Sequence, residues 1–182
     1  MRKLAFILSL LAGPAFASGL QIEVEGEANG IITIDLREDL APGHVEQITA
    51  LAAEGAYDGV VFHRVIEGFM AQTGDVQFGK IEGGDMSRAG TGASDRPDLK
   101  AEFSKERFLR GVVGMARAQN PDSANSQFFI MFAPGEFLNG QYTIVGEVSE
   151  GMDVVDAIKR GDGPNGSVVG RPDVMKKVTV IE

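Results

Sequence analysis

Residues 61–75, VFHRVIEGFMAQTGD, are the most informative segment of the sequence. It is apolar and strand-like, yet it carries a charged and a polar side chain, Arg64 and Gln72, in its interior. Successive side chains of a strand point to opposite faces, so Met70 and Gln72 share one face. We therefore predict a strand that presents an amide and a large apolar side chain to the same surface.

A second segment, NSQFFI at 125–130, has the same arrangement. The alternation rule places Gln127 and Phe129 together on one of its faces. The intervening Phe128, like Met115, is expected to fill the core, as large apolar side chains usually do. The sequence thus contains two strands of this unusual kind, far apart along the chain.

The rest of the chain is also rich in strand patterns. Alternating apolar residues on both sides of Asn29-Gly30 predict a hairpin, because Asn-Gly favours the tight turn between antiparallel strands. Further apolar runs, separated by turn residues, predict strands at 60–66, 111–116, 127–132, 143–148 and 178–181.

Two helices interrupt the strands. The first is predicted to begin at Pro42 and to end before Gly55. The second is marked by Met152, Val155 and Ile158. It is expected to include Lys159 and Arg160 in its last turn and to end before Gly161. Many strands with two short helices favour a mainly β fold, either a closed antiparallel barrel or a sandwich, with the helices at its ends.

Composition excludes several function classes. A length of 182 residues suits one domain of about 150 residues with a sizeable core. Lys and Arg number 17 against 26 Asp and Glu, and the resulting net charge of −9 argues against nonspecific nucleic-acid binding, which needs basic side chains. With no cysteine and two histidines, disulfides, thiol catalysis and imidazole-rich metal sites are not expected.

Residues 1–17 read as a secretory signal peptide, with a basic start, an apolar run and a final Ala-Phe-Ala. The apolar part is shorter than the roughly 20 residues of a spanning helix and contains Gly and Pro, so an uncleaved anchor is the weaker alternative. We predict that cleavage after Ala17 leaves one soluble domain, 18–182, in the bacterial periplasm, without stable membrane insertion.

Motifs of other enzyme classes are either absent or lack the structural context that they require. The segment GDGPNG at 161–166 matches a dinucleotide fingerprint as text, but it follows a predicted helix instead of a strand, so we interpret it as a loop. No G-x-S-x-G motif occurs, and neither His44 nor His63 belongs to an H-E-x-x-H motif. We expect His44 to be exposed near the first helix and His63 to be structural. A hydrolytic or sugar-binding barrel has no positive support in the sequence.

Six segments, taken together, resemble the cyclophilin family of peptidyl-prolyl cis-trans isomerases. They follow the family's order and spacing over essentially all of the mature chain. The resemblance implies a mainly β fold, a closed eight-stranded antiparallel β-barrel capped by two α-helices, and an isomerase that uses no metal and no cofactor. The matching segments are FHR (62–64), GFMAQTGD (68–75), GTG (90–92), GMARA (114–118), SQFFI (126–130) and FLNG (137–140).

The resemblance also implies roles for individual residues. The catalytic group comprises Arg64, the family's arginine, with Gln72 to orient it and Phe129 to hold the proline ring. The substrate-binding residues that it implies are Phe69, Met70, Gly90, Ala116, Arg117, Ala118, Gln127, Phe137, Leu138 and Tyr142.

Three positions depart from the commonest eukaryotic pattern of the family. Phe137 stands where a tryptophan is usual, Tyr142 where an active-site histidine is usual, and Arg117 where asparagine is usual. We expect activity to be retained. We expect any cyclosporin binding to be weakened, because Phe137 lacks the indole N–H donor.

The residue types suit the reaction. An X–Pro bond has nearly equal cis and trans energies but a barrier of about 18–20 kcal/mol from amide resonance. In the twisted state the prolyl nitrogen gains an available lone pair, and the permanently charged Arg64 can donate to it. The expected partners are proline-containing, unfolded or partly folded exported polypeptides, and the expected state is a monomer. A proline-peptide-binding module or chaperone with little catalysis is the alternative.

Overall fold

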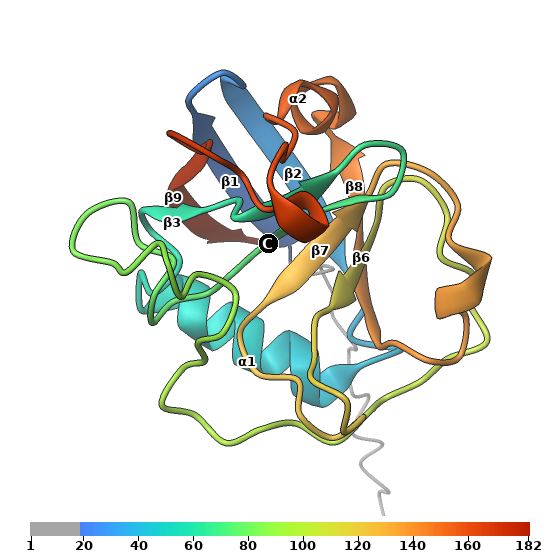
Figure 1. Cartoon of the computed structure of the whole chain (residues 1–182). Coiled ribbons are helices and arrows are strands. Elements are labelled where there is room, and N and C mark those ends of the chain that lie inside the picture. Colours follow the sequence, from blue (N-terminus) through green and yellow to red (C-terminus); the bar gives the residue numbers. More distant parts are fainter. Residues whose placement is uncertain (1–18) are drawn as a thin grey trace, which may run out of the picture.

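A computed structural model describes residues 19–182. The expected signal peptide, residues 1–17, lies outside the described residues. The described chain forms one antiparallel sheet of nine strands, curled around a core, with an α-helix at each of two opposite ends (Figure 1). The mainly β fold with two helices is therefore confirmed.

The strands lie in the order β3-β9-β1-β2-β8-β6-β7-β5-β4 across the sheet. The predicted hairpin is present, since β1 and β2 pair in antiparallel fashion up to Val24 and Gly30. The elements are β1 (Gly19–Glu25), β2 (Gly30–Leu36), α1 (Pro42–Ala53), β3 (Val60–Val61), β4 (Arg64–Ile66), β5 (Met70–Thr73), β6 (Val112–Met115), β7 (Phe128–Met131), the 3-10 turn η1 (Glu136–Leu138), β8 (Ile144–Glu150), α2 (Met152–Ala157), the 3-10 turn η2 (Pro164–Gly166) and β9 (Val174–Ile181).

The sheet has nine strands where eight were expected, because the segment 60–66 forms two short strands, β3 and β4, instead of one. At the break, the N–H of Phe62 donates to the carbonyl of Asp173, and the carbonyl of His63 accepts from the N–H of Val168. β3 therefore pairs with β9, and β4 pairs with β5. No ladder joins β3 to β4 in the described part of the chain, so full closure of the barrel stays a prediction.

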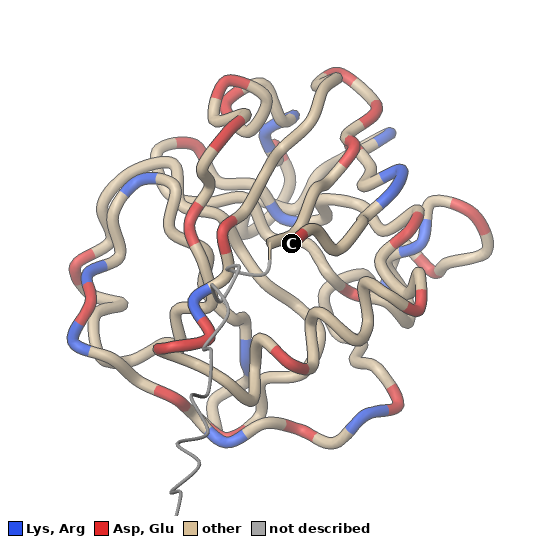
Figure 2. The backbone as a smooth tube through the Cα atoms, turned by 180° about the vertical axis from the view of Figure 1, so that it is seen from behind, with Lys and Arg blue, Asp and Glu red and all other residues tan. Residues whose placement is uncertain are grey.

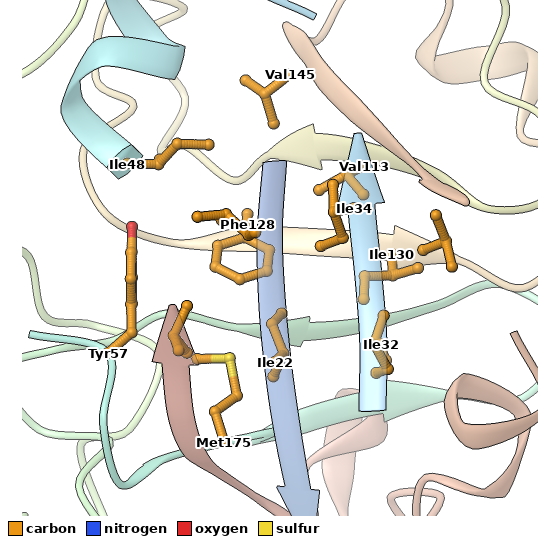
Figure 3. Close-up of a cluster of buried hydrophobic side chains, with 14 of the residues drawn as sticks. Ile22, Ile32, Ile34, Ile48, Tyr57, Val113, Phe128, Ile130, Val145 and Met175 are labelled. Atoms are coloured by element: carbon orange, nitrogen blue, oxygen red, sulfur yellow. The ribbon is translucent and has the colours of Figure 1, made fainter. Parts of the chain in front are cut away.

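The two faces of the central strands pack into different apolar clusters. Ala71 of β5 and Met115 of β6 belong to the main core inside the curled sheet. Phe128 of β7 lies in the same core (Figure 3). Their neighbours Met70 and Phe129 belong to a second cluster. The predicted alternation and the core roles of Phe128 and Met115 are confirmed, and Met70 and Phe129 lie on the outer face.

The first helix begins at Pro42 and ends at Ala53, as predicted. The second helix ends at Ala157, so the expectation that Lys159 and Arg160 lie in its last turn is wrong. The backbone of Ile158 turns to ψ 130°, which is not helical. The N–H of Lys159 then donates to the buried carboxylate of Asp173 at 2.7 Å, so it is no longer available to a helix carbonyl.

The first histidine also differs from expectation, because His44 is buried rather than exposed. Its Nδ1 lies 2.5 Å from Oε2 of Glu102. The same carboxylate accepts the backbone N–H groups of Gly43 and His44, at 3.2 and 3.1 Å. Glu102 thus supplies the acceptors that the first turn of α1 lacks within the helix, and it draws the imidazole inward.

Charged residues are spread over the backbone without a basic stripe. In Figure 2, Lys and Arg are distributed among the more numerous Asp and Glu. Within residues 19–182, neither helix has the length and apolar character needed to cross a bilayer.

Candidate active site

Arg64 lies on β4, directly opposite Gln72 of β5 in the antiparallel pair. Residues in direct cross-strand register project to the same face, and the guanidinium Nη1 donates to Oε1 of Gln72 at 3.2 Å. Nη1 also lies 4.0 Å from Sδ of Met70. The structure thus places Gln72 in contact with Arg64, and the expected role of Gln72 in orienting the arginine stays a prediction.

An amide chain continues from Gln72 across the outer face of the sheet. Arginine can only donate, so Gln72 must turn its oxygen to Arg64 and its nitrogen away. That nitrogen donates to Oε1 of Gln127 at 2.9 Å, and Nε2 of Gln127 donates to the carbonyl of Gly92 at 2.8 Å. Arg64 therefore fixes the orientation of both amides.

The other edge of Arg64 meets a residue that sequence reasoning missed. Nε donates to the backbone carbonyl of Asn165 at 3.0 Å, and Nη2 donates to its Oδ1 at 3.3 Å. Asn165 belongs to η2, within the GDGPNG segment that was interpreted as a loop. Asn-Gly predicts a turn at this point. No local signal reveals that this turn meets a side chain 101 positions earlier.

An apolar pocket of about 320 Å³ opens beside Arg64. Its floor is Phe129, which stacks on Phe108 at 5.8 Å and meets Tyr142 edge-on at 5.9 Å between ring centroids. At the rim, Phe137 is 70% exposed and lies 5.4 Å from Phe69. The pocket is lined by Arg64, Phe69, Met70, Gln72, Ala116, Arg117, Phe129, Phe137, Leu138 and Tyr142.

A second, more polar pocket of about 330 Å³ adjoins the first and shares Gln72, Ala116 and Arg117 with it. Gly90, Ala118 and Gln127 line this second pocket. All thirteen residues that the sequence selected thus lie in one of two adjoining pockets.

Arg117 lines both pockets, and its two terminal nitrogens donate to its own chain. Its guanidinium lies over the ring of Tyr142, 4.4 Å from the centroid, where a cation–π attraction operates. It also donates to the carbonyls of Ala118, Gln119 and Gln141 at 2.9, 3.2 and 2.9 Å. These contacts tie the loop after β6 to the turn before β8.

Two titratable groups near the site are shifted by burial. Partial burial lowers the pKa of Arg64 by desolvation, against a raising influence of Tyr142. Burial of His63 lowers its pKa from 6.5 to about 4, although the Asp75 carboxylate acts in the opposite direction. Gly90 has a φ of +94°, and a Cβ there would lie 2.9 Å from the ring of His63, so this position excludes a side chain.

No cluster of three or more His, Asp or Glu suited to a metal ion occurs within residues 19–182. The polar partners of Arg64 in this part of the chain are neutral groups of Asn165 and Gln72. Within the described residues, no carboxylate therefore contacts the guanidinium group of Arg64. The arrangement suits hydrogen-bond donation to a ligand that lies in the apolar pocket.

Comparison with known proteins agrees with this architecture. Residues 20–180 match the model of the cyclophilin type peptidyl-prolyl cis-trans isomerase/CLD family. A protein of Brucella suis described as a probable peptidyl-prolyl cis-trans isomerase is 62% identical over 153 residues, which cover 84% of this chain and 78% of that protein. Peptidyl-prolyl cis-trans isomerase A of Dickeya dadantii is 36% identical over 188 residues, covering 97% and 94% of the two chains.

Solved structures show the same fold. The cyclophilin AquaCyp293 from Hirschia baltica superposes with a TM-score of 0.70 at 26% identity, covering 88% of this chain and 73% of that one. A Cryptosporidium parvum cyclophilin, crystallised in the presence of the dipeptide Ala-Pro, gives a TM-score of 0.75 at 24% identity, with 90% and 99% covered. The chain belongs to the cyclophilin-type family and is a peptidyl-prolyl cis-trans isomerase.

Proposed function

We propose that this isomerase rotates X–Pro bonds of unfolded or partly folded exported polypeptides, with Arg64 as its catalytic residue. The observation that carries the proposal is the position of Arg64 at the wall of the apolar pocket that contains Met70, Phe129 and Leu138. A proline ring needs apolar surroundings, and the rotating bond beside it needs a donor. This pocket offers both.

The chemistry follows from the geometry of the twisted bond. In the planar ground state the prolyl nitrogen shares its lone pair with the carbonyl and accepts poorly. As the bond twists, the nitrogen becomes pyramidal and accepts a hydrogen bond from Arg64. This contact is stronger in the transition state than in the ground state, which is the requirement for catalysis.

The energy involved is moderate. A hydrogen bond to a charged group is worth roughly 2–3 kcal/mol, and each 1.36 kcal/mol is tenfold in rate, so this contact supplies a factor of about 30–150. The rest of the rate acceleration comes from holding the substrate, since a peptide fixed on both sides of the X–Pro bond can rotate only about that bond.

The second pocket suits the peptide that flanks the proline. Gly90, Ala116 and Ala118 are among the residues that line it. In our proposal, Phe129 holds the ring, Gln72 orients Arg64, and Gln127 fixes the flanking chain. Anchoring on both sides of the X–Pro bond restricts motion to that bond.

The proposed location is the periplasm. Its support is the basic, apolar and small-residue pattern of residues 1–17, which is typical of a cleaved secretory signal. Mass spectrometry of the chain recovered from a periplasmic extract tests this. The mass of a chain that starts after Ala17 supports the proposal, and a full-length chain in the membrane fraction refutes it.

The test of the function is the cis-to-trans rate of an Ala-Pro peptide at low temperature. We expect the mature chain to accelerate it and Arg64→Ala to lose about 30- to 150-fold in kcat/KM while remaining folded. Arg37→Ala is the matched control, because Arg37 pairs with Asp39 at the surface and lines neither pocket. A folded mature chain without acceleration would favour the peptide-binding alternative.

A further inference from the structure

Asn165 holds the edge of Arg64 that Gln72 leaves free. Its backbone oxygen accepts from Nε at 3.0 Å and its Oδ1 accepts from Nη2 at 3.3 Å. Both acceptors belong to one residue, so two parallel contacts define the plane of the guanidinium as well as its position. Gln72 holds Nη1 separately.

The backbone of Asn165 is unusual. With φ 56° and ψ 26°, it is the single non-glycine residue of the described chain in the left-handed region. Asparagine tolerates this region better than most residues. Sparsely populated conformations persist where the surroundings enforce them, and they cluster at functional sites. Here the conformation brings both oxygens of one residue to one guanidinium.

The loop that carries Asn165 is fastened to the strand of Arg64. The N–H groups of Gly161 and Val168, on either side of Asn165, donate to carbonyls of the segment that contains β4, at 2.8 and 3.0 Å. Gly166 packs closely against Ile66, because a Cβ at Gly166 would lie only 2.3 Å from Cγ1 of Ile66. The loop therefore has a fixed position relative to Arg64.

We propose that Asn165 is a positioning residue that aims Arg64 at the apolar pocket. Arginine has five N–H donors, and Asn165 and Gln72 take three of them. One N–H remains on each Nη nitrogen, with the sulfur of Met70 at 4.0 Å from Nη1. This inference rests on the proposed catalytic role of Arg64 and adds the residue that restrains it.

The decisive variant is Asn165→Gly, because glycine keeps the left-handed backbone and the carbonyl but removes Oδ1. We expect kcat to fall about two- to tenfold, as for one net hydrogen bond, with little change in KM or in Tm. Asn29→Gly is the matched control, since Asn29 also precedes a glycine but is exposed and lines neither pocket.

A double-mutant cycle separates positioning from a general structural effect. In an Arg64→Lys background, which has no guanidinium edge to hold, Asn165→Gly should cause no further loss of kcat. An equal fold-loss in both backgrounds overturns the proposal, as does an Asn165→Gly variant with unchanged kcat.

A readout without turnover keeps this test apart from that of the proposed function. NMR of the Arg64 guanidinium reports rotation about its Nε–Cζ bond, which the contacts to Asn165 and Gln72 should slow. We expect faster rotation in Asn165→Gly and no change in Asn29→Gly. Unchanged rotation in Asn165→Gly overturns the positioning role, whereas a wild-type chain with slow rotation and no isomerase activity overturns the proposed function alone.

Discussion

Arg64 and Gln72 stand in direct register across the β4–β5 pair, with 3.2 Å between Nη1 and Oε1. This contact fixes which atoms donate and which accept in the hydrogen bonds beyond Gln72. Gln72 must donate onward to Gln127, and Gln127 must donate to the carbonyl of Gly92. The outer face of the sheet thus carries an ordered series of donors that starts at a cation and ends on the backbone.

Introducing a negative charge at Gln72 tests this order. Gln72→Glu keeps an acceptor for Arg64 but adds a carboxylate that draws the guanidinium charge to itself, and it removes the donor to Gln127. We expect kcat/KM for an Ala-Pro peptide to fall about tenfold at pH 7. Gln77→Glu makes the same change of charge on an exposed residue outside both pockets and should have no effect. Wild-type activity in Gln72→Glu would contradict the proposed order.

Two phenylalanines of the apolar pocket should behave differently. Phe129 is 5% exposed and lies between Phe108 and Tyr142, so Phe129→Ala should cost about 3–5 kcal/mol of unfolding free energy. Phe137 is 70% exposed, so Phe137→Ala should change stability by less than about 0.5 kcal/mol while raising KM. Denaturant unfolding and peptide kinetics on both variants check this, and a large loss of stability in Phe137→Ala would show that its role is structural.

The alternation of apolar residues predicted much of this site. Met70 and Gln72, and likewise Gln127 and Phe129, were placed on shared faces by the period of a strand, and the structure puts all four in the two pockets. The hairpin at Asn29-Gly30 followed from local turn chemistry. These features depend on near neighbours in sequence, which is why the sequence alone was enough.

Features that depend on distant partners could not be predicted in this way. The burial of His44 depends on Glu102, 58 residues later, and the end of α2 depends on the carboxylate of Asp173. Asn165 meets Arg64 across 101 positions. In each case the polar group is satisfied by a long-range contact that leaves no periodic signal in the chain.

The identity of residue 137 offers a test of ligand preference. We expect Phe137→Trp to tighten binding of cyclosporin, because the indole supplies an N–H donor that phenylalanine lacks. The exposed position of Phe137 leaves room for the larger ring at the rim of the pocket. Titration of isomerase inhibition by cyclosporin measures the effect, with Phe103→Trp, another exposed phenylalanine outside both pockets, as the control. Equal inhibition of the wild type and Phe137→Trp would sink the expectation.

Stability should fall on mild acidification because of His63. Its folded pKa of about 4 lies below the ordinary value of 6.5, so the unfolded chain binds the proton more readily between these values. The contribution of neutral His63 to the unfolding free energy is complete above about pH 6.5, and it is lost as pH falls toward 4. Between pH 7 and pH 5 the expected loss is about 2 kcal/mol of unfolding free energy.

The two ring nitrogens of His63 have no hydrogen-bond partner in the described structure, so an apolar ring can replace the imidazole there. His63→Phe should therefore remove most of the change in unfolding free energy between pH 7 and pH 5. Urea denaturation at a series of pH values measures this change in unfolding free energy. Carboxylates with lowered pKa values, such as Glu102, stabilise the fold above their ordinary pKa, which is 4.5 for Glu102. This stabilisation is lost as pH falls through the folded pKa, so it changes mainly below pH 5. A wild-type pH dependence that persists unchanged in His63→Phe would assign the effect to another group.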